Sequence, residues 1–151
     1  MKWMIASDLH GSYYYAQQLQ QAFEREQADR LLFLGDLLYH GPRNDLPRDY
    51  APKKVIPLLN SLAPKLLCVR GNCDAYSRSD AEENLLFNAD GVRIFMTHGH
   101  RYNVKLGYES LANAAHFSGA QLALFGHTHR ALSETMQGLY VVNPGTAGVG
   151  A

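Results

Sequence analysis

The sequence predicts an α/β fold, and two observations carry that prediction. Short apolar runs alternate with longer mixed segments along the chain, as strands and helices alternate in α/β proteins. Hydrophobic residues make up 46% of the 151 residues and charged residues 19%, so the chain can bury enough apolar surface for one core. We therefore expect a single domain over residues 1–151.

Six continuous apolar runs are the candidate strands. Runs of this length are typical of strands that are buried on both faces, although a short buried helix shows the same pattern. The runs cover residues 3–6, 31–34, 66–69, 94–97, 122–125 and 139–142.

Helical patterns lie between these runs. Ser12 can cap a first helix that has an apolar stripe. A second stripe covers residues 55–62, where Pro57 requires the helix to begin near it or to kink. A third helix is expected over residues 110–115. Residues 39–52, rich in Pro and Gly, are predicted to form a long loop that covers the site.

The charge balance and the cysteines exclude several classes of protein. Lys and Arg total 14, as do Asp and Glu, so the chain lacks the basic footprint of a general nucleic-acid binder. Cys68 and Cys73 give neither a zinc-type pair nor a disulfide framework. Asp8 interrupts the apolar N-terminus, and no stretch approaches the roughly 18 apolar residues that span a bilayer. We expect a cytoplasmic protein without membrane contact or specific nucleic-acid binding.

Side chains of metal-ligand types follow five of the apolar runs. Ligands at the carboxyl ends of several strands converge on one crevice in open α/β sheets. Residues two apart in extended chain project to the same side, so an Asp-x-His or His-x-His pair can address one metal. The clusters are Asp8-Leu9-His10-Gly11, Gly35-Asp36, Gly71-Asn72-Cys73-Asp74, His98-Gly99-His100 and Gly126-His127-Thr128-His129.

The mixture of carboxylate, imidazole and amide ligands indicates the kind of metal. It suits Mn, Fe, Co, Ni or Zn better than the all-oxygen sites that Mg or Ca prefer. Two ions roughly 3.5–4 Å apart would need one shared carboxylate, and Asp36 is central in the series. Any one of these residues alone could be a polar strand end or a histidine satisfied in the core. The five clusters in this order predict a metal site.

These motifs, with Asn143-Pro144-Gly145-Thr146, resemble the calcineurin-like metallophosphoesterase superfamily, and more narrowly its small YfcE-type phosphodiesterases. The resemblance covers essentially the whole chain. It implies a two-sheet β-sandwich flanked by helices, with a site for two metal ions along one edge. Manganese is the first expectation, with Fe, Zn, Co or Ni as alternatives. A hydroxide bridging the ions would attack phosphorus in line.

The resemblance also implies a role for each matching residue. Asp8, His10 and His129 would hold the first ion, and Asp36 would be shared. Asn72, His98 and His127 would hold the second ion.

We count Asn72, Cys73 and His98 as catalytic. Cys73 stands where most of the superfamily has a histidine that assists the leaving group, so the general acid stays unidentified. His40, His100 and Arg43 are candidates to contact substrate, and a structural or exposed role is equally open for each.

The C-terminus is the second departure from the superfamily pattern. Relatives continue past the Asn-Pro-Gly motif with further strands, so C-terminal strands are expected to be missing here, and a homo-oligomer could cover the exposed edge. The leading function is a metal-dependent phosphodiesterase acting on a small phosphate ester. A phosphomonoesterase or nucleotide phosphatase is the alternative, and a non-catalytic scaffold, as in a retromer subunit of this fold, is a third.

Overall fold

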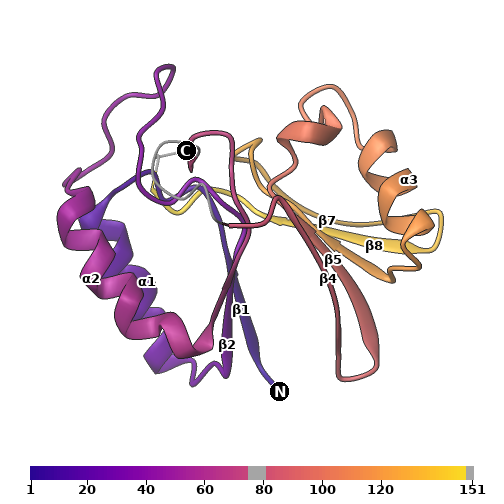
Figure 1. Ribbon diagram of the computed structural model, residues 1–151, viewed down its shortest axis with the longest axis horizontal. Helices are drawn as coiled ribbons and strands as arrows, with labels where there is room; N and C mark the ends of the chain where they lie inside the picture. Colours follow the sequence, from indigo (N-terminus) through magenta and orange to yellow (C-terminus); the bar gives the residue numbers. More distant parts are fainter. Residues whose placement is uncertain (75–80, 149–151) are drawn as a thin grey trace.

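The computed structural model describes residues 1–74 and 81–148 (Figure 1). Its helices are α1 (Tyr13–Arg25), α2 (Pro52–Leu62) and α3 (Glu109–Phe117), with short 3-10 turns η1 (Ala63–Lys65) and η3 (His100–Tyr102). Its strands are β1 (Trp3–Ala6), β2 (Arg30–Phe33), β3 (Leu66–Cys68), β4 (Asn84–Ala89), β5 (Val92–Thr97), β6 (Leu122–Leu124), β7 (Ala131–Met136) and β8 (Leu139–Pro144). Within the described residues, no helix is long and apolar enough to cross a bilayer.

The strands form two sheets, as the sequence predicts. The first sheet has the order β1-β2-β3 and is parallel throughout. The second has the order β4-β5-β6-β8-β7, with a parallel centre and an antiparallel strand at each edge. Figure 1 shows α1 and α2 outside the first sheet and α3 outside the second, so helices flank a sandwich of two sheets.

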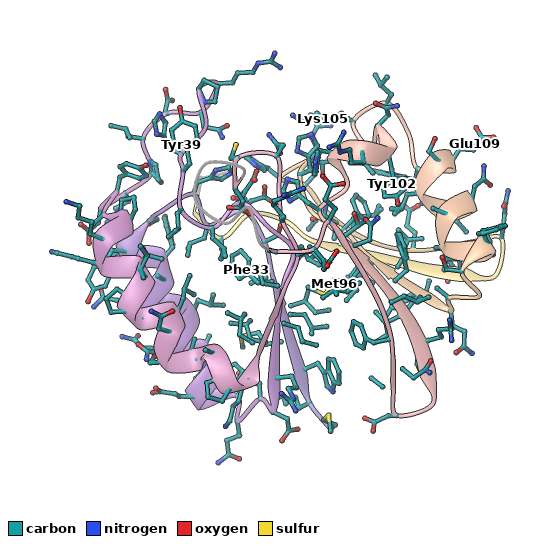
Figure 2. The ribbon with its side chains drawn as sticks, in the orientation of Figure 1. Phe33, Tyr39, Met96, Tyr102, Lys105 and Glu109 are labelled. Carbon is teal, nitrogen blue, oxygen red and sulfur yellow. The ribbon has the colours of Figure 1, made fainter. Side chains whose placement is uncertain are left out.

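The side chains of β2 and the residue after it point alternately to the two faces of the first sheet, and both faces are buried, which explains the continuous apolar run in the sequence. Leu31 and Phe33 pack under α1 and α2, whereas Leu32 and Leu34 pack between the sheets. Met96 of β5 lies in the same layer between the sheets, whereas Phe33 lies on the helix side of β2; both residues are labelled in Figure 2. Both faces of the strand are therefore buried, which removes the polar alternation of a half-exposed strand.

The helix predictions hold, with different boundaries. Ser12 caps α1, because its Oγ accepts the backbone N–H of Tyr15 at 3.2 Å. The second helix begins at Pro52, where a missing N–H costs nothing, and Pro57 lies inside it on an exposed face. The third runs from Glu109 to Phe117, longer than the six residues expected.

Two strands, β4 and β7, are absent from the sequence prediction. In β4, exposed and half-buried residues alternate, and β7 is mostly exposed and contains Glu134. Both are edge strands of the second sheet, and an edge strand with one face exposed to solvent does not form a continuous apolar run. Strands are present near the C-terminus, and the expected strand over residues 139–142 extends to Pro144.

Register aligns the carboxyl ends of the central strands. Ala6, Phe33 and Cys68 pair across the first sheet, and the parallel strands of the second sheet are aligned in the same way. The loops that leave these ends therefore meet at one edge of the sandwich. The backbone N–H of His127, which follows β6, donates to Oδ2 of Asp8, which follows β1, at 3.1 Å and joins the two sheets there.

Candidate metal centre

A first group of ligands consists of Asp8, His10 and His129. Oδ1 of Asp8 lies 3.6 Å from Nε2 of His10 and 3.2 Å from Nε2 of His129. The two imidazole Nε2 atoms are 3.3 Å apart. These separations are those of neighbouring ligands around one small cation, because ligands about 2.0–2.2 Å from a shared ion lie about 3 Å from one another.

A second group consists of Asp36, Asn72, His98 and His127. Nε2 of His98 lies 3.2 Å from Oδ2 of Asp36 and 3.0 Å from Oδ1 of Asn72. The ring of His127 lies 5.0 Å from that of His98, and ligand atoms of His98, His127 and Asp36 lie within 4.8 Å of one another. The structure thus brings all seven residues predicted as ligands to one place.

Asp36 connects the two groups. Its Oδ2 faces His98 at 3.2 Å and also His10 of the first group at 3.7 Å. Its Oδ1 is occupied, because it accepts the backbone N–H of Cys73 at 2.8 Å. One oxygen therefore faces both groups while the other holds the carboxylate in place.

The inner atoms of the centre are poised to accept a cation. Oδ2 of Asp8 accepts the Ser7 hydroxyl at 2.5 Å, but Oδ1 is buried and has no hydrogen-bond partner among the described residues. Nδ1 of His10 lies 2.9 Å from the carbonyl of Tyr39, and Nδ1 of His98 lies 2.6 Å from that of Leu34. Because Nδ1 donates to a carbonyl in each, Nε2 faces the centre and is the atom that would bind a metal ion in exchange for a proton, as in metal-binding histidines.

The electrostatics of the centre favour positive charge. Burial opposes ionisation of Asp8 and Asp36, but the neighbouring histidines outweigh it and hold the pKa of both carboxyls below the ordinary value. Burial would lower the pKa of His98, but Asp36 and Asp8 outweigh it and raise that pKa to about 9. Burial and the charges of His98 and Lys105 lower the pKa of His127 to about 4. The ionised carboxylates thus hold a proton on His98 when no metal is bound, and a bound cation would take the place of that proton.

The backbone is strained at the ligands. Left-handed φ angles are uncommon outside glycine and concentrate at functional sites. Positive φ values between 51° and 68° occur at Asp8, His10, Asp36, His127 and His129. The strand-end turns thus aim the ligand side chains inward.

Two glycines permit the ligand loops to approach closely. A Cβ at Gly71 would collide with the carboxylate of Asp36, and one at Gly126 would collide with Ser7 and Asp8. These positions therefore require glycine, because any side chain would displace a ligand.

Asp74 and Asn143 position the ligand loops, and the sequence does not define their roles. The buried Asp74 carboxylate accepts the backbone N–H groups of Asp36, Leu37 and Gly71 at 2.7, 2.8 and 2.9 Å. Asn143 donates from Nδ2 to the carbonyl of Gly126 at 3.0 Å. The first ties the end of β2 to the end of β3, and the second fixes the loop that carries His127.

Cys73 lies beside the centre with a protonated thiol. Burial, and then the charges of Asp36 and Asp74, raise the pKa of the thiol to about 12. A thiol in this state is a weak nucleophile and a poor proton donor near neutral pH.

A cavity of about 640 Å³ opens over the centre. It is lined by His10, Asp36, Tyr39, Gly41, Pro42, Arg43, Asn44, Asn72, Cys73, Lys105, His127 and His129. Arg43 is thus the one of the three proposed substrate contacts that lines the cavity. The ring of His40 packs against Tyr39 and Tyr50 instead, and that of His100 packs against two ligands, 5.5 Å from the ring of His98 and 6.2 Å from that of His127. Lys105 lines the cavity, but no sequence motif pointed to it.

The donor set fits divalent transition-metal ions. Imidazole nitrogens, carboxylates and one amide suit Mn, Fe, Co, Ni or Zn. A two-sheet α/β sandwich with this ligand cluster at one edge is the arrangement of a candidate metal-binding site.

The comparisons with known proteins identify the family. A model of the calcineurin-like phosphoesterase superfamily domain matches residues 1–150. The chain therefore belongs to the calcineurin-like phosphoesterase superfamily. This confirms two predictions from the sequence: the family that it resembles, and a metal-dependent phosphoesterase as the class of enzyme.

Individual relatives agree with this assignment. The chain is 35% identical over 159 residues to the phosphodiesterase YfcE of Escherichia coli (strain K12), covering 99% of this chain and 80% of that protein. It is 32% identical over 146 residues to the probable metallophosphoesterase YsnB of Bacillus subtilis (strain 168), covering 97% of this chain and 75% of that protein.

Solved structures share the fold. The structure of the E. coli phosphoesterase YfcE matches with a TM-score of 0.83 and 32% identity, covering 99% of this chain and 81% of that chain. Vps29 of Chaetomium thermophilum matches with a TM-score of 0.74 and 19% identity, covering 96% of this chain and 72% of that chain, which shows the fold alone.

Proposed function

We propose that the protein hydrolyses phosphodiesters with two divalent cations held by its own side chains. The position of Asp36 supports this most directly. Its Oδ2 lies 3.2 Å from Nε2 of His98 and 3.7 Å from Nε2 of His10, so one carboxylate can serve both ligand groups. A shared carboxylate is the feature that a two-metal centre needs and a single-ion site does not.

Each ligand has a defined part in this proposal. Asp8, His10 and His129 would hold one ion. Asn72, His98 and His127 would hold the other. When bound, the ions supply the activated water and offset the charge of the phosphoryl oxygens. Manganese is the first candidate, with Fe, Zn, Co and Ni as alternatives that the same donor set accepts.

The protein's own groups keep the centre in a reactive state. The carbonyls of Tyr39 and Leu34 hold the imidazoles of His10 and His98 in one orientation, with Nε2 directed inward. Asp36 is held through Oδ1 by the N–H of Cys73. The site is therefore organised before substrate binds, which lowers the reorganisation needed in the transition state.

Cys73 favours diesters over monoesters. A monoester with an alkoxide leaving group benefits most from a nearby acid, and a thiol with a pKa of about 12 is a poor acid at neutral pH. The relative at 35% identity is itself named a phosphodiesterase. A phosphomonoesterase stays the alternative, because the same metals serve both reactions.

A non-catalytic scaffold is the third candidate, and the Vps29 structures with this fold motivate it. The complete set of seven ligands, with Asp36 facing both groups, favours a hydrolase over a scaffold.

A substrate panel on metal-stripped protein tests the proposal. We expect Mn²⁺ to restore hydrolysis of bis-p-nitrophenyl phosphate, with lower kcat/KM for p-nitrophenyl phosphate. A higher kcat/KM for the monoester would assign a phosphomonoesterase. No turnover of either ester with any of the five metals, in folded protein that binds the ions, would assign a scaffold.

A further inference from the structure

Two cationic side chains line the cavity beside the metal centre. Arg43 comes from the loop between β2 and α2, and Lys105 comes from the segment between η3 and α3. In Figure 2, Tyr39 of the first segment and Lys105 of the second lie on opposite sides of the strand ends. The cavity is thus lined by one cation from each of two segments that are distant in sequence.

Neither cation is used by the fold. Among the described residues, Arg43 and Lys105 make no ion pair and no hydrogen bond. Arg70 and Arg101 differ, because both contact Oε1 of Glu83, at 2.8 and 3.0 Å. Both free side chains are exposed, so they are available to a bound molecule.

The charge around the cavity exceeds what a simple substrate can balance. Of the described residues that line the cavity, Asp36 is the only one with a carboxylate. With two divalent cations and a hydroxide bound, ionised Asp8, Asp36 and Asp74 would leave the centre close to neutral. A simple phosphodiester carries one negative charge, whereas Arg43 and Lys105 carry two positive charges, so the diester alone does not balance both side chains. Such unpaired cations around a cleft attract a more anionic ligand.

We propose that Arg43 and Lys105 form a second anion subsite, and that the substrate is a phosphodiester carrying a further phosphate group. This inference rests on the proposed phosphodiesterase function. A guanidinium binds phosphate with paired N–H groups, and an ammonium acts as a point charge beside it. Tyr39 and Pro42 line the same cavity and give the connecting part of the substrate an aromatic and apolar surface.

A matched pair of chromogenic diesters tests the subsite. The p-nitrophenyl ester of thymidine 5′-monophosphate and its 3′-phosphorylated counterpart have the same scissile bond and differ by one phosphate. With the manganese-loaded protein we expect a higher kcat/KM for the phosphorylated ester. Arg43→Ala and Lys105→Ala should each lower that value about tenfold, the usual effect of a charge-assisted contact, and should lower the value for the other ester by a clearly smaller factor. Lys65→Ala, at the far end of α2, is the control and should change neither.

Equilibrium binding gives a readout apart from turnover. By calorimetry, thymidine 3′,5′-bisphosphate should bind more tightly than thymidine 5′-monophosphate, and Lys105→Ala should remove most of that difference. Equal kcat/KM for the two esters in the unmodified protein would overturn the subsite. Equal losses on both esters in the variants would assign Arg43 and Lys105 to the scissile phosphate and would also overturn it. If neither ester is cleaved, the phosphodiesterase proposal fails, and the binding difference alone decides the subsite.

Discussion

Removal of the metal ions should make the stability of the protein depend on pH above neutrality. The imidazole of His98 is fully buried, with Nε2 3.2 Å from Oδ2 of Asp36 and Nδ1 2.6 Å from the carbonyl of Leu34. Burial alone would lower its pKa, but Asp36 and Asp8 raise it to about 9. In the unfolded chain the pKa is about 6.5. Protonated His98 therefore stabilises the metal-free fold.

The sign and size of the effect follow from linkage. A group whose pKa is raised on folding contributes its full stabilisation below the unfolded value, and the contribution is lost as pH rises through the folded value. The difference between about 6.5 and about 9 corresponds to about 3 kcal/mol in the free energy of unfolding. His10, whose pKa is also raised, acts in the same direction. His127, whose pKa falls to about 4 on folding, acts in the opposite direction, but its effect is confined to pH values near and below about 6.5 and offsets a small part of the change.

Urea unfolding at pH 6.5 and pH 9 measures the effect on chelator-treated protein. We expect a lower free energy of unfolding at pH 9, and a smaller pH dependence after Mn²⁺ is added, because a bound ion takes the place of the proton. His98→Gln should remove most of the dependence, whereas His116→Gln at the exposed end of α3 should keep it. Metal-free stability that is constant or rises between these pH values would refute the reasoning.

Five substitutions at four positions test the roles of individual residues. Asp36→Ala and Asp8→Ala should each lower turnover more than about 100-fold, because even the hydrogen-bond partners of metal ligands contribute about 10- to 100-fold to metal affinity or activity. Circular dichroism should show that the fold of both variants is intact. Cys73→Ser should retain substantial diester hydrolysis, and Cys73→His should raise monoester cleavage; a trapped phosphoryl-cysteine would contradict this. Gly71→Ala should lower the manganese content measured by elemental analysis, because its Cβ collides with Asp36; full metal content would show that the loop can yield.

Much of the metal centre could be predicted from the sequence because its ligands follow buried strands. Continuous apolar runs marked β1, β2, β3, β5 and β6, and the polar residues after each run had to gather at their carboxyl ends. The sharing of Asp36 between both groups stays a prediction of the resemblance, and the positions of its oxygens agree with it. The distances to His10 and His98 needed the structure, since they depend on how the two sheets are packed.

The features that the sequence did not predict share a physical reason. β4 and β7 are edge strands whose exposed faces break the apolar pattern. Lys105 stands in no motif and reaches the cavity only because the segment after η3 lies beside the centre. The role of Asp74 depends on backbone N–H groups from the end of β2, which are distant in sequence. Contacts between residues that are distant in sequence leave no local pattern in the sequence from which they could be predicted.

The metal content of the protein tests the central claim most directly. After chelation and reconstitution with Mn²⁺, anomalous scattering from crystals, together with elemental analysis, should give close to two ions per chain. Both ions should lie within bonding distance of Asp36, one among Asp8, His10 and His129 and the other among Asn72, His98 and His127. A single ion that does not contact Asp36 would contradict the account.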